Sequence, residues 1–219
     1  MAVQSYDYFF NCRHLFLFSV SVNYVWDNGK VVQGNYVTEV LGIPIETPTY
    51  YEYEGDKLVH SYIVGLGDTL HHYYEYDGDR LKTITEGGIV TTVKSYDKNG
   101  NITCFETLLE SGNSVTYEVE WKDGDAVSST TTTHIVERDS TSVEHITYTH
   151  DNYPSAYSHF PIALAAESAN TLAIRGSKHN LLVEGYTNEY KSGRLVRTTT
   201  RGDVKLSYYY TDGVGPDAE

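Results

Sequence analysis

Apolar and polar residues alternate along most of the chain, and a short glycine-containing turn interrupts the alternation at regular intervals. The clearest copy is YEYDGDRL at residues 74–81, and related segments begin at Tyr51, Tyr96, Trp121 and Tyr190. Alternation with a period of two is typical of a β-strand with one buried face, and Asp-Gly or Asn-Gly between two such runs favours a tight turn. Each unit therefore predicts one β-hairpin.

The spacing of the turns defines a repeat of roughly 23 residues, the length of two strands and two turns. The turn glycines are Gly29, Gly55, Gly78, Gly100, Gly124, Gly193 and Gly213. We expect a further turn at Asp151-Asn152. The 41 residues from there to Gly193 exceed one unit and predict an insertion at about 154–182.

The insertion contains the one stretch that favours a helix, residues 158–169. Pro161 suits a first helical turn, and an Ala/Leu run follows it. We expect one short helix near 160–170 that covers an end of the sheet or fills its concave face. Its Phe160, Ile162 and Leu164 are candidates for burial.

These elements predict an all-β fold, an antiparallel up-and-down meander of roughly 14 hairpin strands. Because a flat sheet of that size exposes two edges and a face, the meander should form a large curved sheet or barrel. Residues 1–213 form a single domain in this interpretation, with a C-terminal tail at 214–219. The apolar run 15–22 continues the alternation into the first turn, so we interpret it as a first strand and find no clear signal peptide.

The composition of the chain excludes some classes of binding partner. The formal net charge of −14 argues against nucleic acid and anionic membrane surfaces as partners. No run approaches the roughly 20 apolar residues of a membrane helix, and charges interrupt the strands that a lipid-spanning barrel would need. The two cysteines, Cys12 and Cys104, lack metal-ligand spacing and are interpreted as packing residues, their pairing left open.

Catalytic and metal motifs are sparse. The sequence has no nucleophile elbow, phosphate loop or dinucleotide fingerprint, so we predict no catalytic residue and no cofactor. Adjacent strand residues such as His71 and His72 point to opposite faces and should not share a metal. Two alternatives stay open: a calcium-binding repeat at the Asp97 turn, and a carbohydrate-active hydrolase using paired carboxylates such as Glu118 and Glu120.

Aromatic residues suggest where a ligand would bind. The chain has 21 Tyr. The aromatic residues that flank the turns, which we call the repeat aromatics, either form a flat platform for a glycan or peptide or pack across strands. They include Trp26, Tyr51, Tyr53, Tyr74, Tyr76 and Trp121. We expect a site near the inserted helix, and the candidate ligand-binding residues are His159, Phe160, Lys178, His179, Trp26 and Trp121. No metal ligand is assigned.

The C-terminal half, at 173–197 and 206–210, resembles the domain of unknown function 4595 family. The stretch Gly176 to Leu181 followed by a tyrosine-rich hairpin carries the resemblance, together with tyrosine-aspartate-type repeats elsewhere. Family members often have Pro where Leu182 stands here. The resemblance implies a porin-like fold and predicted secreted proteins of Gram-negative gut bacteria, many of them lipoproteins, and transfers no catalytic residue.

Taken with that resemblance, the sequence predicts a secreted or periplasmic, non-enzymatic binding or structural module of a bacterial cell envelope. A chain trimmed to its mature part would account for the missing signal peptide. A glycan, a peptide or another envelope protein is the expected partner. The sequence does not specify an oligomeric state.

Overall fold

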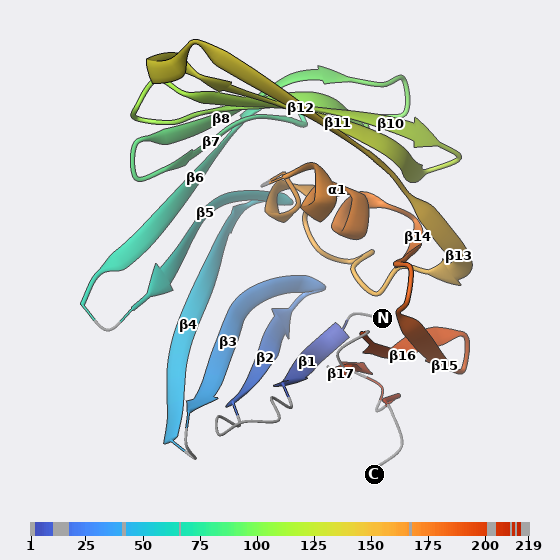
Figure 1. Ribbon diagram of the computed structural model, residues 1–219. Helices are drawn as coiled ribbons and strands as arrows, with labels where there is room; N and C mark the ends of the chain where they lie inside the picture. The colour runs from blue at the N-terminus through green and yellow to red at the C-terminus, as the bar shows by residue number, and fades with distance from the viewer. Residues whose placement is uncertain are drawn as a thin grey trace.

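Long antiparallel strands dominate the structure, as the alternating pattern predicts (Figure 1). The computed structural model describes residues 3–10, 18–40, 43–65, 67–166, 168–200, 205–210, 212 and 214–215. Within these residues, one sheet contains 15 strands. They are β1 (Val3–Phe10), β2 (Phe18–Asp27), β3 (Lys30–Val40), β4 (Ile43–Glu54), β5 (Lys57–Val64), β6 (Thr69–Asp77), β7 (Arg80–Glu86), β8 (Ile89–Tyr96), β9 (Ile102–Leu108), β10 (Ser114–Lys122), β11 (Asp125–Ile135), β12 (Ser140–Thr147), β15 (Thr187–Lys191), β16 (Arg194–Thr199) and β17 (Lys205–Tyr210).

The sheet is a meander whose order departs from the sequence at one place. Strands β1 to β12 follow one another, and β17, β16 and β15 continue the sheet beyond β1. The N-terminal strand therefore pairs with the C-terminal one, with Tyr6 opposite Tyr208. In the described part of the chain the end strands β12 and β15 do not pair, so the all-β meander is confirmed in its curved, open form.

Two details differ from the sequence-based expectation. Strand β1, which precedes the first predicted strand, was not foreseen, and residues 11–17, which include Cys12, lie outside the described part. The expected turn at Asp151-Asn152 is wrong, because both residues lie in strand β13 (Thr149–Pro154). There the Asp151 carboxylate accepts a hydrogen bond from the Tyr153 backbone N–H at 2.8 Å.

Within the described residues the hairpin turns predicted at glycines are formed, and Gly213 lies outside those residues. Gly29, Gly124 and Gly193 have positive φ values of 79°, 95° and 74°, and the residue before each is also left-handed. Two successive left-handed residues are the requirement of a type I′ turn. Just before each repeat aromatic the strand register shifts, for example between Glu52 and Tyr53.

At five strand pairs of the described sheet, a side-chain hydrogen bond links a repeat aromatic to the neighbouring hairpin. The backbone ladder between β3 and β4 ends at Gln33, and beyond it the Tyr53 hydroxyl donates to the Val31 carbonyl at 2.9 Å. Four other strand pairs repeat this arrangement. The bonds are Tyr76 to Leu58 at 3.0 Å, Trp121 Nε1 to Ile102 at 2.7 Å, Tyr210 to Leu195 at 2.8 Å, and Tyr96 to Leu81.

A cation from the preceding turn lies over most of these rings. Lys57 Nζ, for instance, is 5.8 Å from the Tyr76 ring centroid and donates to the Gly78 carbonyl at 2.6 Å. The other pairs are Lys30 over Tyr53, Arg80 over Tyr96 and Arg194 over Tyr210, at 5.5, 5.2 and 5.2 Å. The repeat aromatics are therefore integrated into the sheet and do not form the exposed flat platform considered from the sequence.

The insertion fills the concave side of the sheet (Figure 1). It contains a 3₁₀ turn, η2 (Ile162–Leu164), the helix α1 (Ala169–Gly176) and strand β14 (His179–Leu182), which pairs with β13 in a separate two-stranded sheet. Small side chains let the segment approach the strands closely. Its fully buried positions include Ala163, Ala165, Ala166, Ala169, Leu172 and Ala173.

The α-helix begins later than predicted, because the Ser168 side chain caps it by accepting a hydrogen bond from the Thr171 backbone N–H at 3.1 Å. Of the apolar residues expected to be buried, Leu164 is buried and Ile162 is 42% exposed. At the other end, a β-carbon on Gly176 would lie 3.0 Å from the Trp121 ring. Glycine here allows the helix to pack against that ring.

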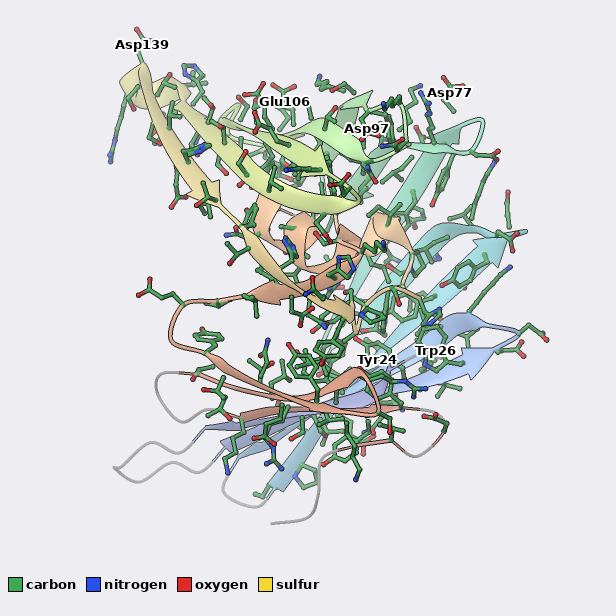
Figure 2. All side chains as sticks on the ribbon, turned by 90° about the vertical axis from the view of Figure 1, so that its right-hand side faces the viewer. Tyr24, Trp26, Asp77, Asp97, Glu106 and Asp139 are labelled. Carbon is green, nitrogen blue, oxygen red and sulfur yellow. The ribbon has the colours of Figure 1, made fainter. Side chains whose placement is uncertain are left out.

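Charged residues lie on the outside. Asp77, Asp97, Glu106 and Asp139 are at the periphery of the molecule (Figure 2). None of the helices in the described part of the chain has the length and apolarity that crossing a lipid bilayer requires.

Replacing Tyr76 with Phe should lower the free energy of unfolding by about 1 to 3 kcal/mol, because the carbonyl of Leu58, a residue only 1% exposed, loses its hydrogen-bond donor. Urea unfolding at neutral pH measures the change. Tyr73→Phe on the same strand is the control, since Tyr73 is 53% exposed and should change stability very little. Equal stability of the two variants would contradict a structural role for the Tyr76 bond.

Candidate functional site

The inserted segment is anchored to the β10–β11 hairpin by a group of polar contacts. Both oxygens of Asp125 accept hydrogen bonds from His179, one from the backbone N–H at 2.9 Å and one from ring Nδ1 at 2.7 Å. The Lys178 N–H donates to the Gly124 carbonyl at 3.0 Å. The Ala126 N–H donates to the Ser177 hydroxyl at 3.0 Å.

The surroundings of Asp125 shift the pKa values of Asp125 and of His150. Desolvation raises the pKa of Asp125, but the hydrogen bonds from His179 outweigh it and hold the pKa below its ordinary value. Desolvation lowers the pKa of the neighbouring His150, against the attraction of Asp125. Asp125 is therefore ionised and His150 is favoured in its neutral form. The Asp125 carboxylate serves to orient His179 and β14.

A second set of contacts joins the insertion to β15, the end strand of the large sheet. The Tyr190 hydroxyl donates to the Asp151 carboxylate, and the Tyr190 and Tyr153 rings stack with centroids 4.3 Å apart. Asn180, 4% exposed, also donates to Asp151, at 3.2 Å, and accepts from the Ala156 N–H at 3.0 Å. Side chains, rather than a backbone ladder, thus connect β13 and β14 to β15.

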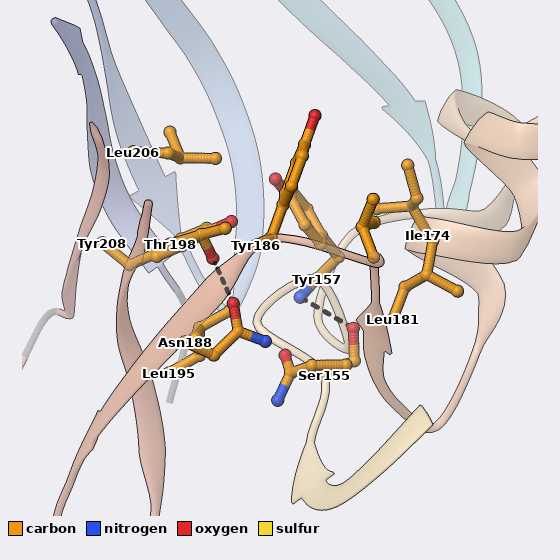
Figure 3. Close-up of a pocket in the computed structure, with 12 residues that line it drawn as sticks. Ser155, Tyr157, Ile174, Leu181, Tyr186, Asn188, Leu195, Thr198, Leu206 and Tyr208 are labelled. Atoms are coloured by element: carbon orange, nitrogen blue, oxygen red, sulfur yellow. Dashed lines mark hydrogen bonds between the residues drawn. The ribbon is translucent and has the colours of Figure 1, made fainter. Parts of the chain in front are cut away.

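Between the insertion and strands β15 to β17 lies a cavity of about 190 Å³, which we call the seam pocket (Figure 3). Its walls are mainly aliphatic and aromatic. The lining residues are Ser155, Tyr157, Ile174, Asn180, Leu181, Val183, Tyr186, Asn188, Leu195, Thr198, Leu206 and Tyr208. Ile174, Val183 and Tyr186 are the exposed members of the set and mark the mouth.

A few polar groups are fixed within these apolar walls. The Thr198 hydroxyl donates to Asn188 Oδ1 at 2.9 Å, a contact drawn in Figure 3, and Asn188 Nδ2 donates to the Tyr190 hydroxyl at 3.3 Å. A side-chain amide has two donor hydrogens and an acceptor oxygen with two lone pairs. Asn188 therefore keeps hydrogen-bonding capacity for a ligand.

The rings of Tyr157 and Tyr186 lie in the middle of the lining, between Leu195 and Tyr208 on the sheet side and Ile174 on the helix side (Figure 3). Tyr157 meets Tyr208 edge to face at 6.3 Å. Aromatic faces beside a fixed amide and hydroxyl suit a molecule with both apolar and polar edges.

Two smaller cavities lie on the other side of the insertion, against the concave face. One, of about 170 Å³, is lined by Tyr24, Tyr51, Thr49, Phe160 and Arg175 among others. The next, of about 130 Å³, shares His72 and Tyr74 with it. Desolvation raises the pKa of Tyr51 far above its ordinary value, so its hydroxyl remains neutral.

Five of the six residues predicted from the sequence fall into two groups, and none of the six lines the seam pocket. Phe160 packs edge to face on Trp26 at 5.3 Å and lines the cavity beside Tyr24. His179 and the exposed Lys178 contact the β10–β11 hairpin at Asp125 and Gly124, and Trp121 lies on that hairpin. His159 is exposed.

Sequence reasoning missed the residues that form the seam pocket. Tyr186 resembles the repeat tyrosines, yet it lies in the connection between β14 and β15. The available signal was the break in the repeat, since a segment that interrupts a regular sheet cannot continue its packing. Residues on both sides of that break, from Ser155 to Tyr208, supply the lining.

The features behind the two alternative functions have local structural roles. The Asp97 carboxylate accepts hydrogen bonds from the backbone N–H groups of Asn99 and Asn101 at 2.8 and 2.9 Å, within its own turn. Glu118 and Glu120 are exposed, and Glu120 accepts from the Ser128 hydroxyl at 2.7 Å. Both line a broad concavity with Asp97 and Cys104.

The described cysteine, Cys104, is free and half-buried. Desolvation raises the pKa of its thiol, and the carboxylates of Glu118 and Glu106 raise it further. The protonated form is therefore favoured, and this is the less nucleophilic form of a thiol.

Comparison with known proteins adds one structural likeness. No protein-family model matches the sequence, and no curated protein sequence matches it. Among solved structures, a porin-like protein from Bacteroides uniformis is similar over 94% of this chain and 96% of its own, with 13% sequence identity and a TM-score of 0.43.

Replacing Asp125 with Ala should lower the free energy of unfolding at pH 7 by about 1.5 to 3 kcal/mol, the range for hydrogen bonds to a charged group. Because the pKa of Asp125 is depressed in the folded state, this stabilisation is complete above the unfolded value of about 3.9 and is lost as the pH falls through the folded value. Urea unfolding of the variant and the wild type from pH 7 to pH 3 measures the difference.

The control for this experiment is Asp79→Ala, which removes a carboxylate 99% exposed and paired with Lys57 at 3.1 Å. Exposed pairs of this kind contribute about 0 to 1 kcal/mol. A difference for Asp125→Ala that stays constant down to pH 3 would refute the ionised-carboxylate account.

Proposed function

We propose that the chain is a non-enzymatic binding module of the bacterial cell envelope, and that it holds one ring of a glycan in the seam pocket. The proposal rests on one observation: the same cavity is lined by aromatic rings and by the amide of Asn188 and the hydroxyl of Thr198, which are held by a hydrogen bond. A sugar ring presents an apolar face to aromatic rings and equatorial hydroxyls to hydrogen-bonding groups. The seam pocket offers both kinds of surface.

The size of the pocket favours a small occupant. Pockets for drug-sized ligands measure about 300–1,000 Å³, whereas the seam pocket measures about 190 Å³. A single ring at the end of a longer chain suits this volume, with the rest of the glycan outside. Ile174 and Val183 at the mouth would flank the emerging chain.

The polar groups are held before any ligand arrives. Asn188 is positioned by Thr198 and Tyr190, and Tyr190 is in turn bonded to Asp151. Fixed donors and acceptors reduce the entropy lost on binding. Such a site favours selective holding of a ligand, and we assign it no turnover.

The envelope location in this proposal comes from the family resemblance of residues 173–197 and 206–210, which implies secretion. The net charge of −14 is consistent with uncharged or cationic partners rather than nucleic acid. Membership of that family and a lipid-anchored form are part of the same proposal.

The proposal is tested by thermal shift of the purified chain against glycans, peptides and divalent cations, followed by titration of any glycan that raises the melting temperature. Tyr186→Ala should weaken glycan binding at least tenfold, because it removes an aromatic wall of the pocket. Since Tyr186 is 42% exposed, its loss should leave the melting temperature of the free protein nearly unchanged.

Tyr73→Ala provides the matched control, an exposed tyrosine on the convex face whose loss should leave glycan affinity unaltered. A stabilising glycan that binds Tyr186→Ala as tightly as the wild type would place its site elsewhere. A shift by calcium alone would instead favour the calcium alternative at Asp97.

A further inference from the structure

The convex face of β4, β5 and β6 carries a row of parallel rings that the glycan proposal does not involve. Tyr50 stacks on Tyr62 at 4.9 Å, and His60 stacks on Tyr73 at 4.7 Å with an interplanar angle of 13°. His71 completes the row, its ring 5.2 Å from that of His60. Register explains the arrangement, because His60 lies opposite Tyr73 and Tyr62 opposite His71.

The two imidazoles face each other edge to edge. Their planes differ by 4°, and His60 Nε2 lies 3.0 Å from His71 Nδ1. In the metal-free state one of these nitrogens carries the proton that they share. Two nitrogens bound to one metal at about 2.05 Å are about 2.9 Å apart at a right angle and about 3.3 Å apart at the tetrahedral angle. The observed separation, which is also that of the hydrogen bond between the rings, lies in this range. Because the ion would lie beside the line that joins the nitrogens, the rings must turn from their hydrogen-bonded alignment to direct both lone pairs at it.

A carboxylate sets the tautomer of His60. Glu52 Oε2 lies 3.0 Å from His60 Nδ1 and accepts its hydrogen, which leaves the lone pair of Nε2 directed at His71. A carboxylate on the far nitrogen of a histidine is the usual outer partner of a metal ligand, where it sets the tautomer and raises the basicity. Stacking on Tyr62 and Tyr73 limits rotation of the His60 ring.

We propose that His60 Nε2 and His71 Nδ1 bind one divalent transition-metal ion on the convex face, with Glu52 orienting His60. The metal replaces the shared proton, and His71 then carries its proton on Nε2, so neutral imidazoles release no net proton. Among the described residues no group of three or more His, Cys, Asp or Glu is arranged around a metal, so this site uses two protein ligands. Its remaining positions are open to water.

The ligand chemistry selects the metal. Imidazole suits copper, zinc and nickel, whereas calcium and magnesium prefer oxygen. In the order of affinities for a given nitrogen site, Cu²⁺ exceeds both Ni²⁺ and Zn²⁺. We therefore expect Cu²⁺ to bind most tightly. Protons compete for the same nitrogens, so binding should weaken on acidification.

The test is titration of the tag-free full chain with Cu²⁺, followed by calorimetry and by electron paramagnetic resonance. The wild type should bind one tight equivalent whose spectrum shows coupling to two nitrogens. His71→Gln should lower the affinity at least tenfold. His71 is exposed, so this variant should keep the wild-type fold, which circular dichroism checks.

Two further variants separate this site from adventitious histidine binding. Glu52→Gln should weaken binding by about tenfold or more, as the loss of an outer-shell carboxylate does. His145→Gln is the matched control, an exposed strand histidine whose Nδ1 lies 3.3 Å from the Thr130 hydroxyl. It should bind Cu²⁺ as tightly as the wild type.

The proposal is overturned if His71→Gln binds Cu²⁺ as tightly as the wild type, or if the spectrum shows a single coupled nitrogen. A loss of affinity in His145→Gln equal to that in His71→Gln would also overturn it, because binding would then be general to surface histidines. None of these outcomes depends on the glycan site, which lies on the other side of the sheet.

Discussion

Near the hairpin turns, some buried backbone carbonyls have no hydrogen-bond donor on the neighbouring strand. The rest of the architecture depends on which group donates a hydrogen bond to them. Between neighbouring hairpins the backbone ladder ends two residues before the carbonyl, at Gln33 for Val31 and at His60 for Leu58. A buried carbonyl without a partner costs about 1 to 3 kcal/mol. The repeat aromatic supplies the donor, and burial raises the pKa of Tyr76 to about 12, so its hydroxyl keeps the hydrogen it donates. The strands can therefore diverge at this rim, and the sheet can curve, without leaving polar groups unpaired.

The same rule explains where the insertion attaches. At the position held by Lys30, Lys57, Arg80 and Arg194 in other hairpins, the β10–β11 hairpin has Asp125. The cations lie over the tyrosine of an adjacent hairpin, whereas Asp125 binds His179 of the insertion. Ser177 likewise contacts Ala126, where a repeat aromatic would contact Leu58. The insertion thus occupies the place of the missing repeat.

Sequence reasoning succeeded where local chemistry decides the structure and failed where distant contacts do. The turns at Gly29 and Gly124 follow from residues that tolerate positive φ, and the strands from alternation. The extended conformation of Asp151 depends on Tyr190 and Asn180, which lie 39 and 29 residues away, so the local Asp-Asn signal misled. His71 and His72 were correctly separated onto opposite faces, since His72 pairs with Glu86 and His71 with His60. No sequence pattern indicated that His60 and His71, which are diagonal neighbours in the pairing of β5 with β6, would come into contact.

The seam pocket has its origin in the break of the repeat. Where the repeat is regular, one hairpin is joined to the next by the aromatic hydrogen bond described for Tyr53, Tyr76 and Trp121. Between β12 and β15 that periodic contact is absent, and the irregular side chains of the insertion bridge the gap through Asp151, Asn180 and Tyr190. An irregular segment cannot reproduce the complementarity of identical units, so a cavity remains beside it. The side chains that line this cavity can change without disturbing the hydrogen bonds that hold the regular sheet together.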